Sequence, residues 1–424
     1  MPHRQVHGSR WLAIRTLVFL LACGLAYKFE HAAENFLEGE HGASTIGQSV
    51  FSVRNVYQYL VTAWPRTLVP RYSVILTLDP EADPTAAGLG ENVCDQRSYL
   101  AQLIPALAER GPAVIVVDKF FVESGCAKEE PTRQLKEAIG RIGARVPVIV
   151  GLSIEQRWTA QEEGPTHLPA ARKPLNFPAT ALLHEAIVNT DDDSRRIPLG
   201  WVIHRSVMEA PRWFDGLAVA AAEAYDAKLW TKYPRLAQLR DERRNPYLSM
   251  IAPRDHVYVN AGEVLCSSSA ARAGFEAACA RLKPSGTDAS YLRGRVVIIG
   301  QMSNDADRHA TVIGNVQGVV LQANYLEALL DERYFSPVRP WVDYMVGFLV
   351  FIGIEASLRH PSMWRSLLYL AFVLAGTLVV LSLSIRYLGY YVNPITVSAF
   401  VLSIKLIGWL AERINQVGGS HHGT

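Results

Sequence analysis

The sequence predicts an α/β domain, with a mixed or mostly parallel sheet covered by helices, joined to four transmembrane α-helices. Three observations lead to this fold class. Apolar runs with few charges lie near both ends of the 424-residue chain, most of the charge lies between residues 28 and 337, and short β-branched runs alternate there with amphipathic stretches. Apolar strands separated by helices are typical of a sheet that is at least partly parallel and covered on both faces.

The first transmembrane helix is predicted at residues 11–27, a short apolar run that follows Arg4 and Arg10. Basic residues before a span keep that side in the cytoplasm, so we expect residues 1–10 to be cytoplasmic. A cleaved signal peptide is the alternative, because Leu20 to Cys23 resembles a loose lipoprotein cleavage box.

Three further runs of about twenty mostly apolar residues have the length of transmembrane helices, with Trp and Tyr near their ends as at membrane interfaces. They lie at residues 338–356, 367–385 and 390–410. The connector after the first of these runs holds Arg359 and Arg365, whereas the next connector holds only Arg386. Positively charged loops favour the cytoplasmic side. The tail at residues 411–424 is therefore predicted to be cytoplasmic, and residues 28–337 extracytoplasmic.

Within residues 28–337, continuous apolar runs predict buried strands at 73–78, 113–117, 146–151 and 295–300. Helical spacing of apolar residues predicts helices at 98–110 and 129–142. Residues 155–178 and 231–256 carry Pro, Gly and mixed charges with little periodicity, and they are interpreted as surface excursions within one domain.

Acidic residues follow the carboxyl ends of three predicted strands, namely Asp79, Asp118, and Asp305 with Asp307. Open α/β sheets bind their ligands at this edge, so these four residues are the candidate ligand-binding residues, and they are expected to line one pocket. The alternative is that they cap the turns and helices that follow the strands.

The sequence contains no motif that predicts catalysis: it has no G-x-S-x-G, P-loop, H-E-x-x-H or kinase signature. We therefore expect no enzyme activity and no cofactor. Asp305, Asp307 and His309 offer possible metal ligands, but no second cluster accompanies them, and a solvated loop is the preferred interpretation. The formal net charge of +2 excludes the large basic face that a nucleic-acid partner requires.

Four of the five cysteines fall between the predicted spans, and an even number suits an oxidising compartment. Local pairing favours Cys266 with Cys279 and Cys94 with Cys126. The alternative is four unrelated thiols, because sequence alone cannot fix connectivity.

In order along the chain, these segments resemble the CHASE2 family, an extracytoplasmic sensor domain of bacterial membrane receptors. The resemblance covers most of residues 50–410. It rests on SVILTLD at 73–79, AVIVVDKFF with Asp118, VPVIVG at 146–151, LRGRVVIIGQMSNDADRHAT at 292–311 and GVVLQANYLEALLDERYF at 318–335. The last of these resembles the family's closing helix, which leads into the membrane.

The resemblance implies a sensor or regulatory subunit of the bacterial inner membrane, with a periplasmic domain and an unidentified ligand. Homodimerisation is common among such receptors. About fourteen residues follow Leu410, so we expect a separate signalling output protein. The alternative function is a structural or scaffolding subunit of a cell-envelope complex that binds no ligand.

Overall fold

The computed structural model divides the chain into two compact units, a sheet unit at Pro65–Tyr334 and a helical unit made of Met1–Trp64 with Phe335–Thr424. It describes residues 68–407 except 80–82, 87–91, 124–125, 153, 159–164, 170–174, 179, 181, 189–193, 204–211, 283–288, 303–306, 359–361, 394–396, 398–399, 402–403 and 405–406. The predicted first span at 11–27, both cytoplasmic ends and Asp305 therefore lie outside the described residues.

The sheet unit is built on a six-stranded sheet of order β10-β1-β11-β2-β3-β6, in which every described strand pair is parallel. Its strands are β1 (Ser73–Leu78), β2 (Val114–Phe120), β3 (Val148–Leu152), β6 (Leu183–Ile187), β10 (Tyr258–Asn260) and β11 (Val296–Gln301). The four predicted strands correspond to β1, β2, β3 and β11. The α/β class with a parallel sheet is thus confirmed.

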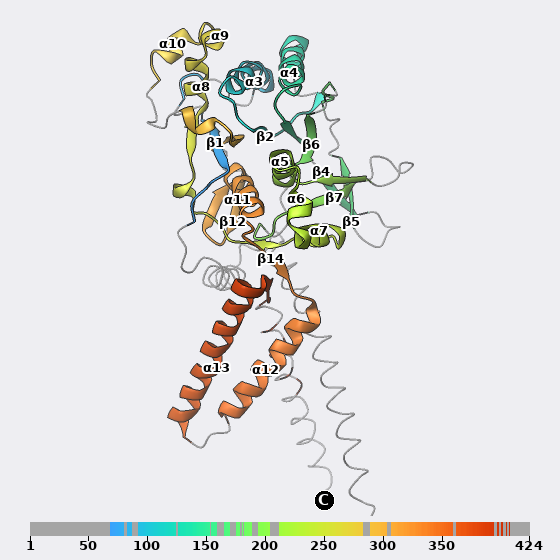
Figure 1. Cartoon of the computed structure of the whole chain (residues 1–424), viewed down its shortest axis with the longest axis vertical. Coiled ribbons are helices and arrows are strands. Elements are labelled where there is room, and N and C mark those ends of the chain that lie inside the picture. The colour runs from blue at the N-terminus through green and yellow to red at the C-terminus, as the bar shows by residue number, and fades with distance from the viewer. Residues whose placement is uncertain are drawn as a thin grey trace, which may run out of the picture. The chain divides into compact units, whose positions relative to one another are not determined.

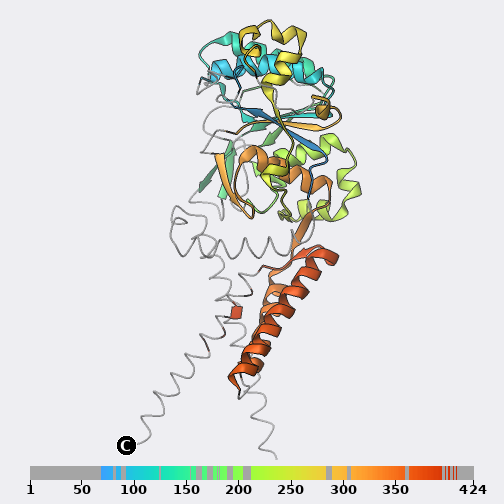
Figure 2. The same cartoon turned by 90° about the vertical axis from the view of Figure 1, so that its left-hand side faces the viewer.

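Helices cover both faces of this sheet, as Figures 1 and 2 show. Alternate residues of each strand enter two separate cores, because successive side chains of a strand point to opposite faces. Val74 and Leu76 lie in the core under α3 (Val93–Ala108), α4 (Glu129–Ile142) and α8 (Ala261–Ser267). Ile75 lies in the other core, under α5 (Leu217–Tyr225) and α11 (Gly318–Leu330).

Helix α3 begins at Val93, five residues before the predicted start at Ser98. The Asn92 side chain caps it by accepting a hydrogen bond from the Cys94 backbone N–H at 3.0 Å. A cap of this kind satisfies one of the N–H groups that the first turn leaves without a partner. Gly111, at φ +71°, then reverses the chain into β2.

The two segments interpreted as surface excursions hold regular structure. A second sheet has the order β4-β5-β7-β8, and α7 lies in the later segment. The elements of this region are β4 (Ile154–Trp158), β5 (Pro165–Pro169), β7 (Gly200–Ile203), β8 (Arg212–Asp215), α6 (Leu229–Lys232), α7 (Pro234–Asp241), β9 (Tyr247–Leu248) and η3 (Pro253–Asp255). The small sheet lies beside β6, where Ile187 bridges to Gly216.

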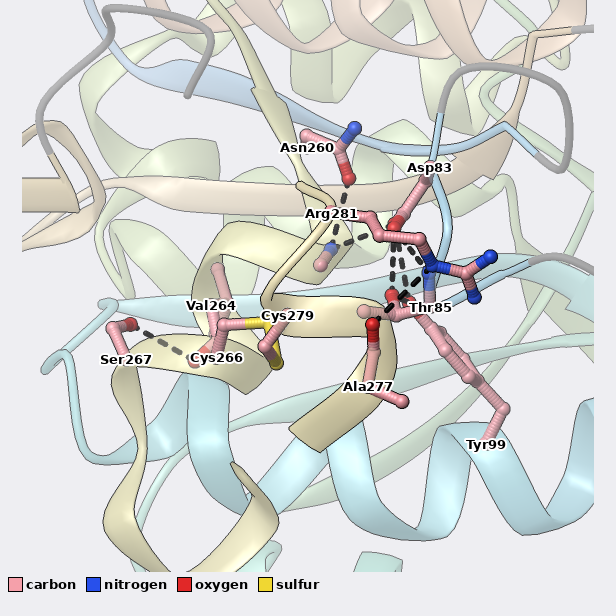
Figure 3. Close-up of a disulfide and its surroundings, with 11 residues drawn as sticks. Asp83, Thr85, Tyr99, Asn260, Val264, Cys266, Ser267, Ala277, Cys279 and Arg281 are labelled. Atoms are coloured by element: carbon pink, nitrogen blue, oxygen red, sulfur yellow. Dashed lines mark hydrogen bonds between the residues drawn. A yellow bond between two sulfur atoms is a disulfide. The ribbon is translucent and has the colours of Figure 1, made fainter. Parts of the chain in front are cut away.

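The remaining elements of the sheet unit are α9 (Ser269–Arg272), α10 (Glu276–Cys279), η4 (Ala289–Leu292), β12 (Arg308–Thr311) and β13 (Gly314–Gln317). Figure 3 shows the disulfide between Cys266 of α8 and Cys279 of α10, whose Cα atoms are 5.5 Å apart. The structure also joins Cys94 to Cys126, with Cα atoms 5.0 Å apart. These are the two pairings that local spacing favours.

Buried Asp83 lies close to the first of these disulfides (Figure 3). Its carboxylate accepts hydrogen bonds from the Gly262 backbone N–H at 2.8 Å and from the Thr85 hydroxyl at 2.7 Å. Asn260 accepts from the same Gly262 N–H at 2.8 Å. The loop after β1 is thus fastened to the start of α8 by a buried carboxylate whose oxygens have donors.

In the helical unit, α12 (Pro340–Leu358) forms a helix where the second span is predicted, and it packs beside α13 (Met363–Leu383). Helix α13 continues through η6 (Ser384–Leu388), and β14 (Tyr334–Pro337) pairs with β15 (Tyr390–Tyr391). Among the described residues, one helix, Met363–Leu388, is long and apolar enough to cross a membrane. It contains the predicted third span at 367–385.

Small residues set the spacing of helices within this unit. A Cβ on Gly347 would lie 2.9 Å from the Phe400 ring, and one on Gly353 would lie 2.9 Å from the Val373 side chain. Glycine at such positions lets helix backbones approach closely, as in many membrane helix pairs. Asp343 is buried here and accepts a hydrogen bond from the Asn393 backbone N–H at 2.9 Å.

Candidate functional site

A cavity of about 340 Å³ opens at the carboxyl edge of the six-stranded sheet. Its walls come from the ends of β1, β2 and β11, together with residues from α3 and from the segments that follow β6 and β11. The lining residues are Leu78, Leu100, Val117, Asp118, Lys119, Phe120, Val188, Ile299, Gly300, Gln301 and Asp307. The cavity therefore combines an apolar wall with a small set of charged and amide groups.

Strand order explains why a cavity forms here. Strand β11 lies between β1 and β2. The chain leaves β1 and β2 toward the α3 and α4 layer, whereas it leaves β11 toward α11 on the opposite face. Where the connections after neighbouring strands leave toward opposite faces of the sheet, a crevice remains at the carboxyl ends of those strands, and open α/β sheets bind ligands there.

A β-bulge shapes the β2 side of the cavity. Val117 pairs with Val150, but the next pair is Phe120 with Gly151, so two residues of β2 stand between consecutive pairs. Those two residues are Asp118 and Lys119. A bulge turns side chains away from the regular alternation and is common beside functional sites.

Gly151 makes room for this bulge. A Cβ at Gly151 would lie 2.7 Å from the Lys119 carbonyl oxygen, closer than real contacts allow. Any side chain there would displace the backbone that carries Asp118. The glycine at the end of β3 is thus part of the site's framework.

Asp307 reaches the cavity from the other side of β11. Its carboxylate lies against the first residue of α11, because a Cβ on Gly318 would be 2.5 Å from one carboxylate oxygen. The amino end of a helix favours negative charge close by. The Nε2 atom of His309 also lies 3.2 Å from the Oδ1 atom of Asp307.

Burial raises the pKa of Asp118 to about 7, and the nearby charge of Asp307 raises it further in the same direction. Removing a carboxylate from water disfavours its charged form, and so does a second carboxylate. Burial also lowers the pKa of Lys119, whose ammonium donates a hydrogen bond to Gln96 of α3. At neutral pH the site thus holds one carboxyl group poised between its acid and its base forms.

Comparison with known families assigns the chain. The model of the CHASE2 domain matches residues 50–356, well over half of the sequence. The chain belongs to the CHASE2 family. This match identifies an extracytoplasmic sensor domain of membrane proteins. No curated protein and no solved structure matches the chain.

The structure of this CHASE2 domain brings two of the four candidate aspartates together. Asp118 and Asp307 line the same cavity. Asp79 is not among its lining residues, and its backbone carbonyl accepts a hydrogen bond from the Asp83 N–H at 2.8 Å in the turn after β1. Asp305 lies outside the described residues.

Sequence reasoning did not select Lys119 or Gln301, which also line the cavity. Lys119 directly follows Asp118, and Gln301 directly follows the predicted strand at 295–300. Their position just after predicted strands is the sequence feature that could have identified them as lining residues. Among the described residues, no group of three or more His, Cys, Asp and Glu side chains is placed to hold a metal ion.

Replacing Asp118 with asparagine is expected to stabilise the CHASE2 domain at pH 8 by about 2 kcal/mol. The folded-state pKa of about 7 lies above the unfolded value of 3.8, so the native carboxyl group contributes stability below pH 4. That stability is lost as pH rises through 7. Partial exposure of Asp118 reduces the full effect. Thermal unfolding of the full chain in detergent at pH 5 and pH 8 measures it.

The asparagine variant should melt a few degrees above the wild type at pH 8, with a smaller difference at pH 5. Asp241→Asn, at an exposed position on α7, serves as the control and should change neither curve. An Asp118→Asn variant that melts below the wild type at pH 8 would show that the Asp118 carboxylate stabilises the fold.

Proposed function

We propose that this chain is a non-catalytic sensor subunit whose CHASE2 domain binds a small molecule outside the cytoplasm. The observation that carries the proposal is the cavity at the carboxyl ends of β1, β11 and β2, within a domain of a sensor family. Ligand cavities usually combine apolar walls with a few polar groups that orient the ligand. The cavity beside Asp118 and Asp307 has that composition.

In this proposal the chain crosses the bacterial inner membrane four times, at residues 11–27, 338–356, 367–385 and 390–410. The domain is periplasmic and both termini are cytoplasmic. Support comes from the apolar helix Met363–Leu388 and from two disulfides in the sheet unit, which persist in oxidising compartments. Arg359 and Arg365 favour a cytoplasmic position for the connector that holds them.

Alkaline phosphatase fusions, which are active only outside the cytoplasm, test this topology. A fusion after Ser336 is expected to be highly active, and a fusion after Arg365 nearly inactive. Fusion after Tyr387, between the third and fourth predicted spans, should restore activity. An active fusion after Arg365 would overturn the four-span arrangement while leaving the family assignment untouched.

The signal would pass inward through the membrane helices to a separate output protein, with the chain acting as a homodimer. A ligand shifts a conformational equilibrium only as far as it binds one state better than the other. Cross-linking in native membranes with and without ligand, followed by identification of co-purified chains, tests the partner. Failure to capture any signalling protein in either state would count against this step.

The scaffold function makes a different prediction. Ligands that bind the native state raise its melting temperature, whereas a domain that has lost ligand binding gives no such shift. Thermal unfolding of the full chain in detergent, against a panel of metabolites, peptides and ions, separates the two functions. A shift that Asp307→Asn abolishes supports the sensor function.

A further inference from the structure

We propose that the cavity recognises a small organic cation, whose ammonium group lies between Asp118 and Asp307 and whose hydrocarbon part lies against the apolar wall. This inference rests on the proposed function and adds the class of ligand.

Two carboxyl groups that are 189 positions apart in the sequence converge in one small cavity, Asp118 from β2 and Asp307 from the segment after β11. The charge of Asp307 raises the pKa of Asp118, so the two carboxyl groups disfavour being ionised at the same time. A cation between them would replace repulsion by two attractions. A cationic ligand would therefore relieve the repulsion between the two carboxylates in the cavity.

The basic side chains near Asp118 and Asp307 already have hydrogen-bond partners. Lys119 follows Asp118 on β2 and donates its ammonium hydrogen bond to Gln96, on the α3 side of the sheet. His309 of β12 lies against Asp307, with 3.2 Å between its Nε2 atom and the carboxylate Oδ1 atom. Among the described residues, no lysine or arginine forms a salt bridge with Asp118 or Asp307.

Much of the remaining lining of the cavity is hydrocarbon. The apolar lining residues are Leu78, Leu100, Val117, Phe120, Val188 and Ile299. An inorganic ion would leave this wall in contact with water, whereas an amine with a short alkyl or aromatic body would cover it. The volume of about 340 Å³ is at the small end of ligand cavities, which suits a ligand of modest size.

Binding should depend on pH because Asp118 must release its proton to meet the cation with full charge. With a pKa of about 7 for Asp118, affinity is expected to rise about 30-fold between pH 5.5 and pH 8. Alkylammonium groups, like the lysine side chain, remain charged across this range. The His309 ring contacts the Asp307 carboxylate, so it needs a control of its own.

The test titrates hexylamine, 1-hexanol and hexanoate into the full chain in detergent, by calorimetry at pH 5.5 and pH 8. Hexylamine is expected to bind, with the stated rise in affinity, and the two isosteric probes at least tenfold more weakly. Asp118→Asn should remove the pH dependence and weaken binding, and Asp307→Asn should weaken binding at both pH values. His309→Gln should retain most of the pH dependence, and Asp241→Asn should match the wild type.

The melting temperature of each variant without probe shows whether it is folded. Equal binding of hexylamine and hexanol, preference for hexanoate, or hexylamine binding that survives both aspartate substitutions would each overturn the cationic ligand. Absence of hexylamine binding to the wild type would also overturn it. If another probe or metabolite binds in the cavity, the proposed sensor function stands although the cationic ligand is excluded. If no member of a broad panel shifts the melting temperature, both proposals fail.

Discussion

Replacing Glu327 with alanine is expected to lower the free energy of unfolding of the sheet unit by about 4 kcal/mol. This side chain is fully buried in α11. Its carboxylate accepts backbone hydrogen bonds from Arg71, Tyr72 and Ser73 at 2.9, 2.8 and 2.6 Å, and a fourth from the Ser73 hydroxyl at 2.7 Å. Alanine would leave these donors, some of them buried, without their acceptor.

Chemical denaturation of the full chain in detergent measures this effect. Glu327→Gln retains one acceptor oxygen but turns an amide N–H₂ group toward donors, so an intermediate loss is expected. Glu137→Ala is the matched control, because Glu137 lies on the exposed face of α4 and pairs only with Arg133 in the described contacts. Its loss should stay below about 0.5 kcal/mol. An alanine variant at 327 within that range would contradict the structural role of Glu327.

Glu327 also shows what the sequence could not reveal. The segment around it was identified by family resemblance as the closing helix, and α11 does form there. A single acidic residue in an apolar helix gives no sign of its partners, which lie more than 250 positions away in the sequence. Contacts of this separation depend on how the sheet is assembled, and local periodicity carries no information about that.

The central strands were predictable for a physical reason. A strand covered on both faces must be apolar on both, so it appears as a continuous run such as VVIIG. The edge strand β10 is three residues long, and β4 and β5 lie in a segment of mixed polarity. Short strands and strands of mixed polarity leave no such run, so these elements could not be predicted from it.

The site was predictable in part. Parallel strands end at the same edge, which is why Asp118, near the end of β2, and Asp307, in the segment after β11, share one cavity. The insertion of β11 between β1 and β2, and the bulge at Asp118 and Lys119, follow from three-dimensional pairing. Strand order therefore brings Asp118 of β2 beside the strand that leads to Asp307.

Removing the disulfide between Cys94 and Cys126 with the double serine variant is expected to lower the free energy of unfolding by about 3.5 kcal/mol. The bond closes a loop with a sequence separation of 32 and so restricts the unfolded chain. It ties the first turn of α3 to the segment between β2 and α4. Arg97 makes a second link there, donating to the Val122 carbonyl and the Thr132 hydroxyl, so the variant should still fold.

Chemical denaturation with and without a reductant checks this expectation. Reductant should remove the difference between the wild type and the double variant, because it opens both disulfides of the wild type and the one that the variant retains. The double serine variant of Cys266 and Cys279 is the comparison, because its shorter separation of 13 gives a smaller expected loss, about 3 kcal/mol. A Cys94 and Cys126 variant as stable as the wild type would show that this bond does not restrain the unfolded chain.

The Cys94 and Cys126 bond also has a consequence for the cavity that the other disulfide lacks. The segment it fixes continues directly from Asp118, Lys119 and Phe120, which line the cavity, whereas Cys266 and Cys279 lie on α8 and α10. Loosening that segment lets the cavity wall sample more conformations, and a ligand must then order it on binding. Ligand affinity should therefore fall in the double variant of Cys94 and Cys126 and stay unchanged in that of Cys266 and Cys279. Equal affinities in the two variants would show that the Cys94 and Cys126 bond stabilises the fold without contributing to ligand binding.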